Sequence, residues 1–244
     1  MIINIDNIDR EFINFEELNK QIKTSVDDNI IINGCMGQRY IGSGLKGKNI
    51  VINGVPGNAL GGYLDGVVIT VNGNAQDATG DTMNDGTIYI HGSSGDATGY
   101  AMRGGKIFIR DNAGYRAGIH MKAYKDKTPV LIIGGCAGSF LGEYQAGGLI
   151  VVLGLNNKGN APVGNFCGTG MHGGKIFLRC DRLPADLPKQ VVSSLETADL
   201  KEIEPYLDEF CKVFNISKDE IMGQNFFVLI PDTKNPYKQL YINN

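Results

Sequence analysis

The side chains most able to do chemistry are scattered along this chain rather than gathered into motifs. The three histidines, His91, His120 and His172, have no metal-ligand spacing among themselves, and no cysteine stands beside any of them. A zinc site needs three or four ligands at short, characteristic spacings. The cysteine count is odd and no C-x-x-C occurs, which argues against both a disulfide framework and a zinc site. We therefore expect no metal site. The cysteines are Cys35, Cys136, Cys167, Cys180 and Cys211.

Carboxylates and glycine runs are the next candidates for a catalytic or cofactor site. Glycoside-cleaving enzymes need a pair of carboxylates at a fixed separation, and this sequence shows no tight pair. A dinucleotide loop needs a strand, a G-x-G-x-x-G turn and then a helix, whereas every glycine run here leads into another strand pattern. We expect no catalytic and no cofactor-binding residues. The scattered acids are Asp65, Asp81, Asp85, Asp96 and Glu143.

The composition narrows the class of protein. Charged residues make up 20% and the net charge is −3, so nothing indicates nucleic acid or an anionic membrane as a partner. No apolar run approaches the ~18 residues of a membrane helix, and the start lacks a signal-peptide pattern. These features predict a soluble cytoplasmic protein. The 34 glycines among 244 residues are unusual and indicate a repeat architecture.

A repeat of about 19 residues organises the chain from residue 29 to residue 180. "MRGGKIFIR" (102–110) returns as "MHGGKIFLR" (171–179), and Asp77-Ala-Thr-Gly80 returns 19 residues later. Each unit has an aliphatic I-x-I pair, typical of a short strand, followed by glycines at fixed offsets. Glycine suits tight corners because it adopts positive φ without strain. The corner glycines we predict are Gly34, Gly54, Gly73, Gly92, Gly61, Gly80, Gly99, Gly118 and Gly142.

A unit of this length is too short for a strand, a crossover helix and a return strand. It suits one turn of an all-β, single-stranded solenoid of about eight rungs, with the aliphatic pairs stacked inside. The first pair members of successive rungs include Ile50, Ile69, Ile88 and Ile107. This pattern predicts that these four side chains are neighbours on successive strands.

Both ends of the repeat have helical patterns. Residues 14–26 offer Asn14 as a helix cap, with Leu18, Ile22 and Val26 at helical spacing. After Arg179 the glycines stop, and apolar residues from Leu200 to Phe214 follow helical spacing, with Pro205 interrupting them or opening a second helix. Ser217 and Glu220 have the spacing of a capping box, and "FFVLIP" (226–231) is typical of a strand or an extended tail. We expect a cap over 1–28, a solenoid over 29–180 and a helical appendage with an extended tail over 181–244.

Between the two aliphatic columns lies an outward column that is also apolar. An exposed sheet face is normally polar, and an apolar stripe of several hundred Å² usually marks an interface. Two alternatives remain open: the chain's own C-terminal helices cover it, or a partner docks on it. The candidate interface residues are Tyr89, Phe108, Ile132, Val151 and Phe177, in a column that begins with Ile31, Val51 and Thr70. Asn33, Asn53 and Asn72 are expected to form a structural amide ladder.

The sequence motifs of the repeat resemble those of one family. "PGNALGGYLDG" (56–66), "GNAQDATGDTMNDG" (73–86), "GTGMHGGKIFLR" (168–179) and "NPYKQLY" (235–241) resemble the glycine-repeat (GXGXG) domain that closes the large subunit of glutamate synthase. In some prokaryotes this domain stands alone as a separate chain called domain 3. The resemblance implies a right-handed parallel β-helix without an active site of its own. Asp81, Asp111, Ser139 and Gln145 depart from the family pattern.

The resemblance also implies a function and partners. In the family, an N-terminal-nucleophile glutaminase releases ammonia, and an FMN and iron–sulfur domain uses it to aminate 2-oxoglutarate. We expect a non-catalytic scaffold subunit of a glutamate synthase-type oxidoreductase complex that binds no cofactor and positions glutaminase and FMN-dependent synthase chains. One alternative is a subunit of a formylmethanofuran dehydrogenase-like complex, which carries similar repeats. Another is a self-associating homo-oligomer with its own carbohydrate- or amide-directed activity.

Overall fold

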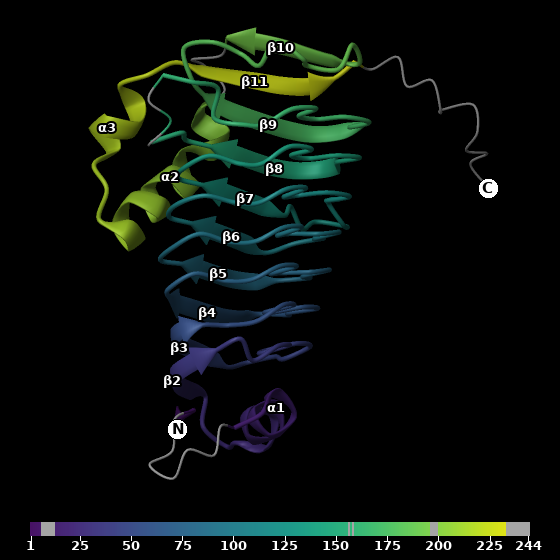
Figure 1. Cartoon of the computed structure of the whole chain (residues 1–244). Helices are drawn as coiled ribbons and strands as arrows, with labels where there is room; N and C mark the ends of the chain where they lie inside the picture. The colour runs from purple at the N-terminus through teal and green to yellow at the C-terminus, as the bar shows by residue number, and fades with distance from the viewer. Residues whose placement is uncertain (6–12, 156, 158, 196–199, 233–244) are drawn as a thin grey trace, which may run out of the picture.

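A single sheet of 11 strands runs through the whole molecule (Figure 1). The computed structural model describes residues 1–5, 13–155, 157, 159–195 and 200–232. The spatial order of the strands is β1-β2-β3-β4-β5-β6-β7-β8-β9-β11-β10. The strands are β1 (Ile2–Asn4), β2 (Asn29–Met36), β3 (Asn49–Val55), β4 (Val67–Asn72), β5 (Gly86–Ile90), β6 (Lys106–Ile109), β7 (Val130–Ile133), β8 (Ala146–Val152), β9 (Gly173–Arg179), β10 (Val191–Leu195) and β11 (Phe226–Pro231). The helices are α1 (Phe15–Thr24), α2 (Leu200–Phe214) and α3 (Lys218–Met222).

The register of the parallel strands follows the sequence repeat. Ile50 pairs with Ile69, Ile69 with Ile88, and Ile88 with Ile107. The predicted alignment of these four isoleucines is confirmed, and none is more than 1% exposed. Each strand with the segment that follows it is called a layer here and takes the name of its strand.

The predicted fold class is wrong. The chain is not an all-β, right-handed parallel β-helix that ends in a helical tail. It is one mixed sheet with a few helices, because β11 pairs antiparallel with β9 and β10 pairs antiparallel with β11. The 19-residue period reports the spacing and register of strands from residue 29 to residue 180. It carries no information on the later strands that extend the sheet and change its type.

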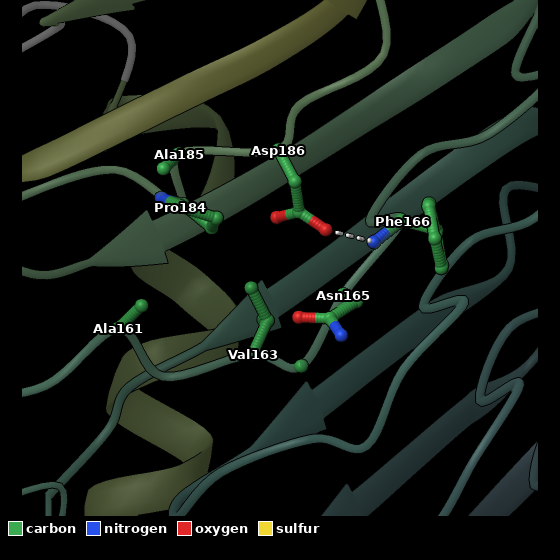
Figure 2. Close-up of a pocket in the computed structure, with 8 residues that line it drawn as sticks. Ala161, Val163, Asn165, Phe166, Pro184, Ala185 and Asp186 are labelled. Atoms are coloured by element: carbon green, nitrogen blue, oxygen red, sulfur yellow. Dashed lines mark hydrogen bonds between the residues drawn. The ribbon is translucent and has the colours of Figure 1, made fainter.

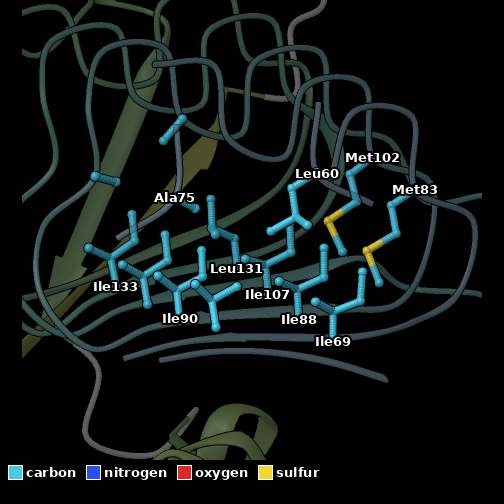
Figure 3. Close-up of a cluster of buried hydrophobic side chains, with 14 of the residues drawn as sticks. Leu60, Ile69, Ala75, Met83, Ile88, Ile90, Met102, Ile107, Leu131 and Ile133 are labelled. Carbon is cyan, nitrogen blue, oxygen red and sulfur yellow. The ribbon is translucent and has the colours of Figure 1, made fainter. Parts of the chain in front are cut away.

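The main core lies between the strands and the segments that lead back to them. The inward isoleucines of β4, β5 and β6 line up, and Leu60, Met83 and Met102 face them from the returning segments (Figure 3). Those segments are themselves in register, since parallel bridges join Ala75 to Ser94, Ser94 to Ala113 and Ala113 to Ala137. Full burial of each isoleucine contributes about 1.5–3 kcal/mol. Every layer therefore depends on its neighbours for a core.

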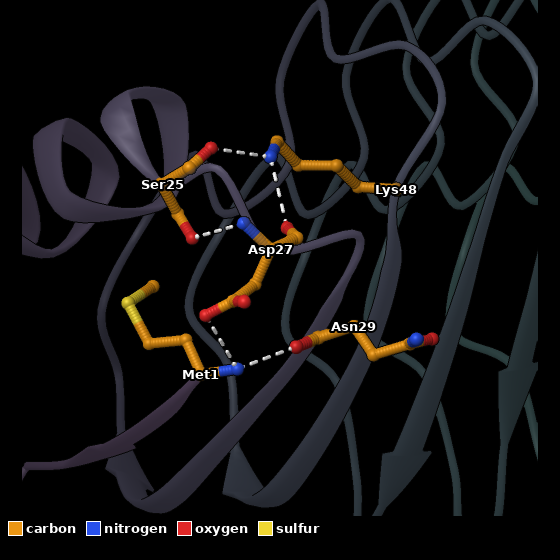
Figure 4. Close-up of polar contacts among 5 residues, drawn as sticks. All are labelled: Met1, Ser25, Asp27, Asn29 and Lys48. Atoms are coloured by element: carbon orange, nitrogen blue, oxygen red, sulfur yellow. Dashed lines mark hydrogen bonds and ion pairs between the residues drawn. The ribbon is translucent and has the colours of Figure 1, made fainter.

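The N-terminal segment closes one end of the sheet. Asn14 Oδ1 accepts the N–H of Glu17 at 2.9 Å, so the predicted helix cap is confirmed. Leu18 and Ile22 are buried, but Val26 lies beyond the helix and is 96% exposed, contrary to the predicted apolar face. Polar contacts tie the segment after α1 to the first layers: Lys48 Nζ donates to the carbonyls of Ser25 and Asp27, and the Met1 ammonium group pairs with Asp27 (Figure 4).

The C-terminal segment departs from the expected appendage in two ways. Helix α2 continues through Pro205 rather than ending there. Ser217 occupies the N-cap position of α3 but makes no side-chain capping bond, so the predicted capping box does not form. Of the two forms expected for "FFVLIP", the strand is confirmed: it is β11, which joins the sheet directly beside β9. The motif "NPYKQLY" (235–241) lies outside the described residues.

Candidate interaction surfaces

The outward apolar column crosses the sheet from end to end. Strand register places its members side by side: Ile2, Ile31, Val51, Thr70, Tyr89, Phe108, Ile132, Val151, Phe177 and Val228. We call these residues the outer stripe. Its two halves have different surroundings.

The half of the outer stripe from β6 to β9 is covered by the chain itself. Phe108, Ile132, Val151 and Phe177 are fully buried. They form a second hydrophobic cluster with the apolar face of α2 and with α3, which contributes Ile203, Leu207, Phe210, Phe214 and Ile221. Of the two alternatives left open by the sequence, the structure shows intramolecular cover here. These four candidate interface residues are therefore not accessible to a partner.

Polar contacts fix the direction of α2 across the strands. Glu202, near its start, pairs with Lys175 of β9 at 2.7 Å. Glu209, two turns later, pairs with Lys106 of β6 at 2.6 Å and accepts the Tyr89 hydroxyl of β5. The helix thus runs across the sheet from β9 to β5, and its axial length of about 22 Å is enough to cross four strand spacings, which amount to about 19 Å.

The lower end of α2 meets β5. The His91 and Phe214 rings lie 5.0 Å apart in an edge-to-face contact. Burial, with a smaller contribution from the charge of Arg110, lowers the pKa of His91. Tyr89, the fifth candidate interface residue, is half-buried beneath Glu209. Burial and the Glu209 carboxylate raise the pKa of this tyrosine.

Arg179 attaches the end of the C-terminal helices to the sheet. Its guanidinium group is buried and donates to the carbonyls of Ile221 at 2.6 Å, Glu220 at 2.7 Å and Leu153 at 3.0 Å. Burial lowers its pKa. Arg110 has the same place in the first copy of the nonapeptide, yet it is exposed and pairs with Asp111. The sequence offered no signal that separates these two arginines.

The half of the outer stripe from β1 to β4 remains accessible. Ile2 is 65% and Ile31 36% exposed, while Val51 and Thr70 are half-buried. Beside them runs the predicted amide ladder, which is confirmed: Asn72 donates to Asn53 and Asn53 to Asn33, each at 2.7 Å. This half is an accessible face that combines apolar and amide groups.

The corner glycines fall into two groups. In the series Gly61, Gly80, Gly99, Gly118 and Gly142, every φ lies between 62° and 72°. Their missing side chains would point into the core: a Cβ on Gly61 would lie 2.8 Å from Ile88 Cδ1 and one on Gly118 2.5 Å from Ile150 Cδ1. Gly99 is looser, at 3.8 Å from Leu131 Cδ2.

The second group of corner glycines lies at the ends of the strands. Gly34 and Gly54 also have positive φ, at 69° and 129°. Gly92 does not, but a Cβ there would collide with Asn74 Oδ1 and with the backbone of Gly73. In this group, glycine is needed partly for positive φ and partly because the neighbouring backbone leaves no space for a Cβ.

The residues two positions before and two positions after each glycine of the Gly61 to Gly142 series also have positive φ. Their side chains point outward. Non-glycine residues fill most of these positions, at roughly 1–2 kcal/mol each. In layers β6 and β7 they are large: Arg116, His120, Phe140 and Tyr144. The rings stack between layers, with His120 and Tyr144 5.3 Å apart and Phe140 and Phe166 5.0 Å apart. These outward rings were not predicted from the sequence, although bulky residues two positions from a regularly spaced glycine are visible in it.

A depression of about 430 Å³ lies beside Phe166 (Figure 2). Its lining is mainly small and apolar, and its one carboxylate, Asp186, accepts the Phe166 N–H at 2.9 Å. The lining consists of Ala161, Val163, Gly164, Asn165, Phe166, Pro184, Ala185 and Asp186.

The scattered acids serve structural contacts. Asp65 and Asp85 pair with Lys46 and Lys127, and Glu143 pairs with Arg116. Asp96 Oδ1 accepts the N–H of Tyr115 in the next layer, and Asp81 accepts the Thr82 hydroxyl.

The five cysteines are free thiols, and each is buried or half-buried. Burial raises the pKa of Cys35 to about 11 and that of Cys167 to about 12. No group of three His, Cys, Asp or Glu side chains that could hold a metal ion occurs within the described ranges. In the same part of the chain, no helix has the length and apolar character that crossing a bilayer requires.

Known proteins similar to this chain share either its sequence or its fold. The model of the GXGXG motif family matches residues 6–232. The uncharacterized protein MJ1350 of Methanocaldococcus jannaschii is 44% identical over 249 residues, which cover 96% of this chain and 95% of that protein. A chain of the formyltransferase/hydrolase complex FhcABCD from Methylorubrum extorquens, solved with methylofuran, has a TM-score of 0.62 at 23% identity. That match covers 81% of this chain and 71% of the other, and it shows a shared fold rather than a shared function.

Proposed function

The chain belongs to the GXGXG motif family, which is found in the C-terminal domain of the glutamate synthase large subunit, and on that premise we propose that it is a non-catalytic scaffold subunit. In this proposal it acts in the cytoplasm as part of a glutamate synthase-type complex. It positions a glutaminase chain and an FMN and iron–sulfur synthase chain, and it supplies no cofactor ligand itself.

The observation that carries the proposal is the match of the family over residues 6–232, nearly the whole sheet with its helices. The packing within the chain is consistent with a scaffold role. The sheet is stiffened by a core shared between layers and by α2 bound along four strand spacings. Charged side chains near the sheet mostly serve contacts within the chain, such as Lys106 with Glu209. A rigid body of this kind can keep two partners at a fixed separation.

Reconstitution tests the proposal. The full chain is co-expressed with the glutaminase and the FMN-dependent synthase of its own organism, and the assembly is measured by size-exclusion chromatography with light scattering. We expect a stable complex of all three chains. Leaving this chain out should reduce glutamine-dependent glutamate formation while ammonia-dependent formation by the synthase persists. Equal glutamine-dependent rates with and without the chain would contradict the scaffold function.

A second candidate function has one observation in its favour, the fold shared with a chain of the formyltransferase/hydrolase complex. In that case the chain would belong to a formyl-group-processing assembly, such as a formylmethanofuran dehydrogenase-like complex. The same co-expression with the formyltransferase chains of its organism separates the two, because a scaffold should assemble with one set of partners and not with the other.

The third alternative is a homo-oligomer with its own carbohydrate- or amide-directed activity. It predicts self-association of the isolated chain at micromolar concentration together with substrate turnover. Light scattering and a hydrolysis assay on the isolated chain test it directly.

A further inference from the structure

Three aromatic rings form a ladder on the corner edge of layers β5, β6 and β7. The Tyr100 and His120 rings meet edge to face at 5.9 Å, and the His120 and Tyr144 rings are stacked at 5.3 Å with an angle of 10°. Tyr100 is 39% and Tyr144 47% exposed, so the ladder adds little to the core. His120 and Tyr144 also occupy left-handed corners, with φ of 55° and 54°, where glycine would be less strained. Because the left-handed conformation recurs at the corners of the other layers with small residues such as Ala78 and Ala97, the aromatic side chains and not the conformation distinguish this edge.

Two cations stand beside this ladder without an acidic partner. Arg103 follows the buried Met102, and Lys122 follows the buried Met121, so both project outward in adjacent layers. Within the part of the chain that the structure describes, neither side chain has an ion pair or a hydrogen bond.

The same column is neutralised in the lower layers. There Lys46 pairs with Asp65 at 2.7 Å, and the next position is the uncharged Asn84. Beside the column, Asp85 is already paired with Lys127 at 2.8 Å. Arg103 and Lys122 occupy the two layers above. The two uppermost cations of this column therefore lack the acids that the lower layers provide.

We propose that the edge formed by Tyr100, Arg103, His120, Lys122 and Tyr144 is a docking surface for an acidic segment of a partner protein. The inference rests on the scaffold function proposed above and assigns one of its contact surfaces. Carboxylates of the partner supply the missing opposite charges for Arg103 and Lys122. They also face the outward ring edges, which carry the positive end of the aromatic quadrupole.

The ring geometry favours an acidic protein segment over a single-stranded nucleic acid. Bases bind such edges by stacking on open ring faces. Here one face of Tyr144 is turned to His120, and on the side of the next layer a Cβ on Gly170 would lie 2.5 Å from Tyr144 Cδ1. No open face remains on Tyr144 for a base. The net charge of −3 also gives the chain no general attraction to polyanions.

Peptide titration tests the surface without any native partner. The full chain is titrated with a fluorescent peptide that alternates Glu and Phe, with a peptide that alternates Lys and Phe, and with oligo-dT. We expect binding of the acidic peptide alone, weakening as salt rises above ~0.1 M because exposed charges are then screened. Equal binding of both peptides, or tighter binding of oligo-dT, would overturn the assignment.

Variants locate the binding. Arg103→Glu/Lys122→Glu should weaken the acidic peptide about tenfold or more, because charges across an interface then repel. Tyr144→Ser should weaken it by a smaller factor. The matched control is Lys23→Glu/Arg182→Glu, which makes the same change of net charge at exposed sites on α1 and after β9. Arg103→Lys/Lys122→Arg should retain binding. If the control weakens binding as much as the first pair, the surface is not the binding site.

Reconstitution separates this inference from the proposed function. If the wild-type chain assembles with glutaminase and synthase and the Arg103→Glu/Lys122→Glu variant does not, both stand. If both chains assemble equally well, the scaffold function stands and the docking surface is wrong. If the wild-type chain fails to assemble, the scaffold function fails, and the peptide titration alone decides whether the edge binds acidic segments.

Discussion

The two halves of the outer stripe have similar residues and opposite surroundings. From β6 to β9 the stripe is fully buried under α2, whereas from β1 to β4 it faces solvent or is half-buried. Both halves belong to one column of one sheet and follow the same repeat. The difference comes from a segment more than 20 residues away from the last strand of the repeat. Hydrophobic pattern therefore identifies a surface that needs cover, and a separate element decides how much of it is covered.

The boundary lies at β5, where α2 ends. There Tyr89 is bonded to Glu209 and His91 touches Phe214. Below this point the Asn33, Asn53 and Asn72 ladder continues the face with amide groups. If the two halves differ as described, equivalent substitutions must have unequal effects.

The largest effect is expected from a cavity under α2. Phe177→Ala should lower the free energy of unfolding by about 3–5 kcal/mol, because its ring is fully buried between sheet and helix. The control, Ile31→Ala in the exposed half, should cost about 1 kcal/mol or less. Urea denaturation followed by circular dichroism measures both. Equal losses at the two positions would mean that α2 does not cover the stripe in solution.

The next effect concerns the attachment of α3. Arg179→Met removes the donor to three carbonyls and leaves buried acceptors without partners, which should cost about 2–3 kcal/mol. Arg110→Met, at the equivalent place in the other nonapeptide, should change stability by no more than about 0.5 kcal/mol, since its ion pair is exposed. Limited proteolysis should show faster cleavage near α3 in the first variant only. Unchanged cleavage would mean that Arg179 does not hold α3 against the sheet.

A smaller effect is expected from the ion pair in the middle of α2. Glu209→Gln weakens the contact with Lys106, whose side chain is 31% exposed, and should cost about 1 kcal/mol. Glu204→Gln removes an exposed pair with Lys218 on the outer side of α2 and should be nearly neutral. Thermal unfolding of the two variants under identical buffer conditions gives the comparison. A larger loss for Glu204→Gln would indicate that the helix is rotated from its described orientation.

The smallest effect is a pH dependence at the lower end of α2. The folded-state pKa of His91 is below its unfolded value of about 6.5. The unfolded chain therefore binds the proton first, so the stabilising contribution is complete above about pH 6.5 and is lost as the pH falls towards the folded pKa. Urea midpoints between about pH 7.5 and pH 5 should fall less steeply in His91→Gln than in the wild type. His172→Gln, at an exposed position, should keep the wild-type slope.

The sequence predicted those features that repeat. The period of about 19 residues was sufficient to align Ile50, Ile69 and Ile88, because every layer has to bury the same positions against its neighbours. The Asn53 ladder followed from the same register. Gly61 and Gly118 were recognisable as corners, since the core leaves no space for a Cβ there. Asn14 was identified because helix capping is a local signal.

Features outside the repeat were not predictable in the same way. The antiparallel pairing of β10 and β11 involves contacts between distant segments with no shared period, and the fold class was therefore wrong. The amphipathic pattern of α2 was visible, but pattern alone does not specify whether its apolar face meets this chain or another. The burial of Arg179 depends on where Glu220 and Ile221 are placed, which no local rule specifies.

The constant spacing between β3 and β6 has a consequence for how such a molecule changes over evolutionary time. Strands β3 to β6 follow one another with 19-residue pairing offsets, so duplication or loss of one unit, for example 67–85, leaves all remaining neighbours compatible. Each such event alters the length of the sheet across its strands by one increment of ~4.8 Å. The reach of the protein can thus be adjusted in discrete steps while the chemistry of its two extremities is inherited unchanged.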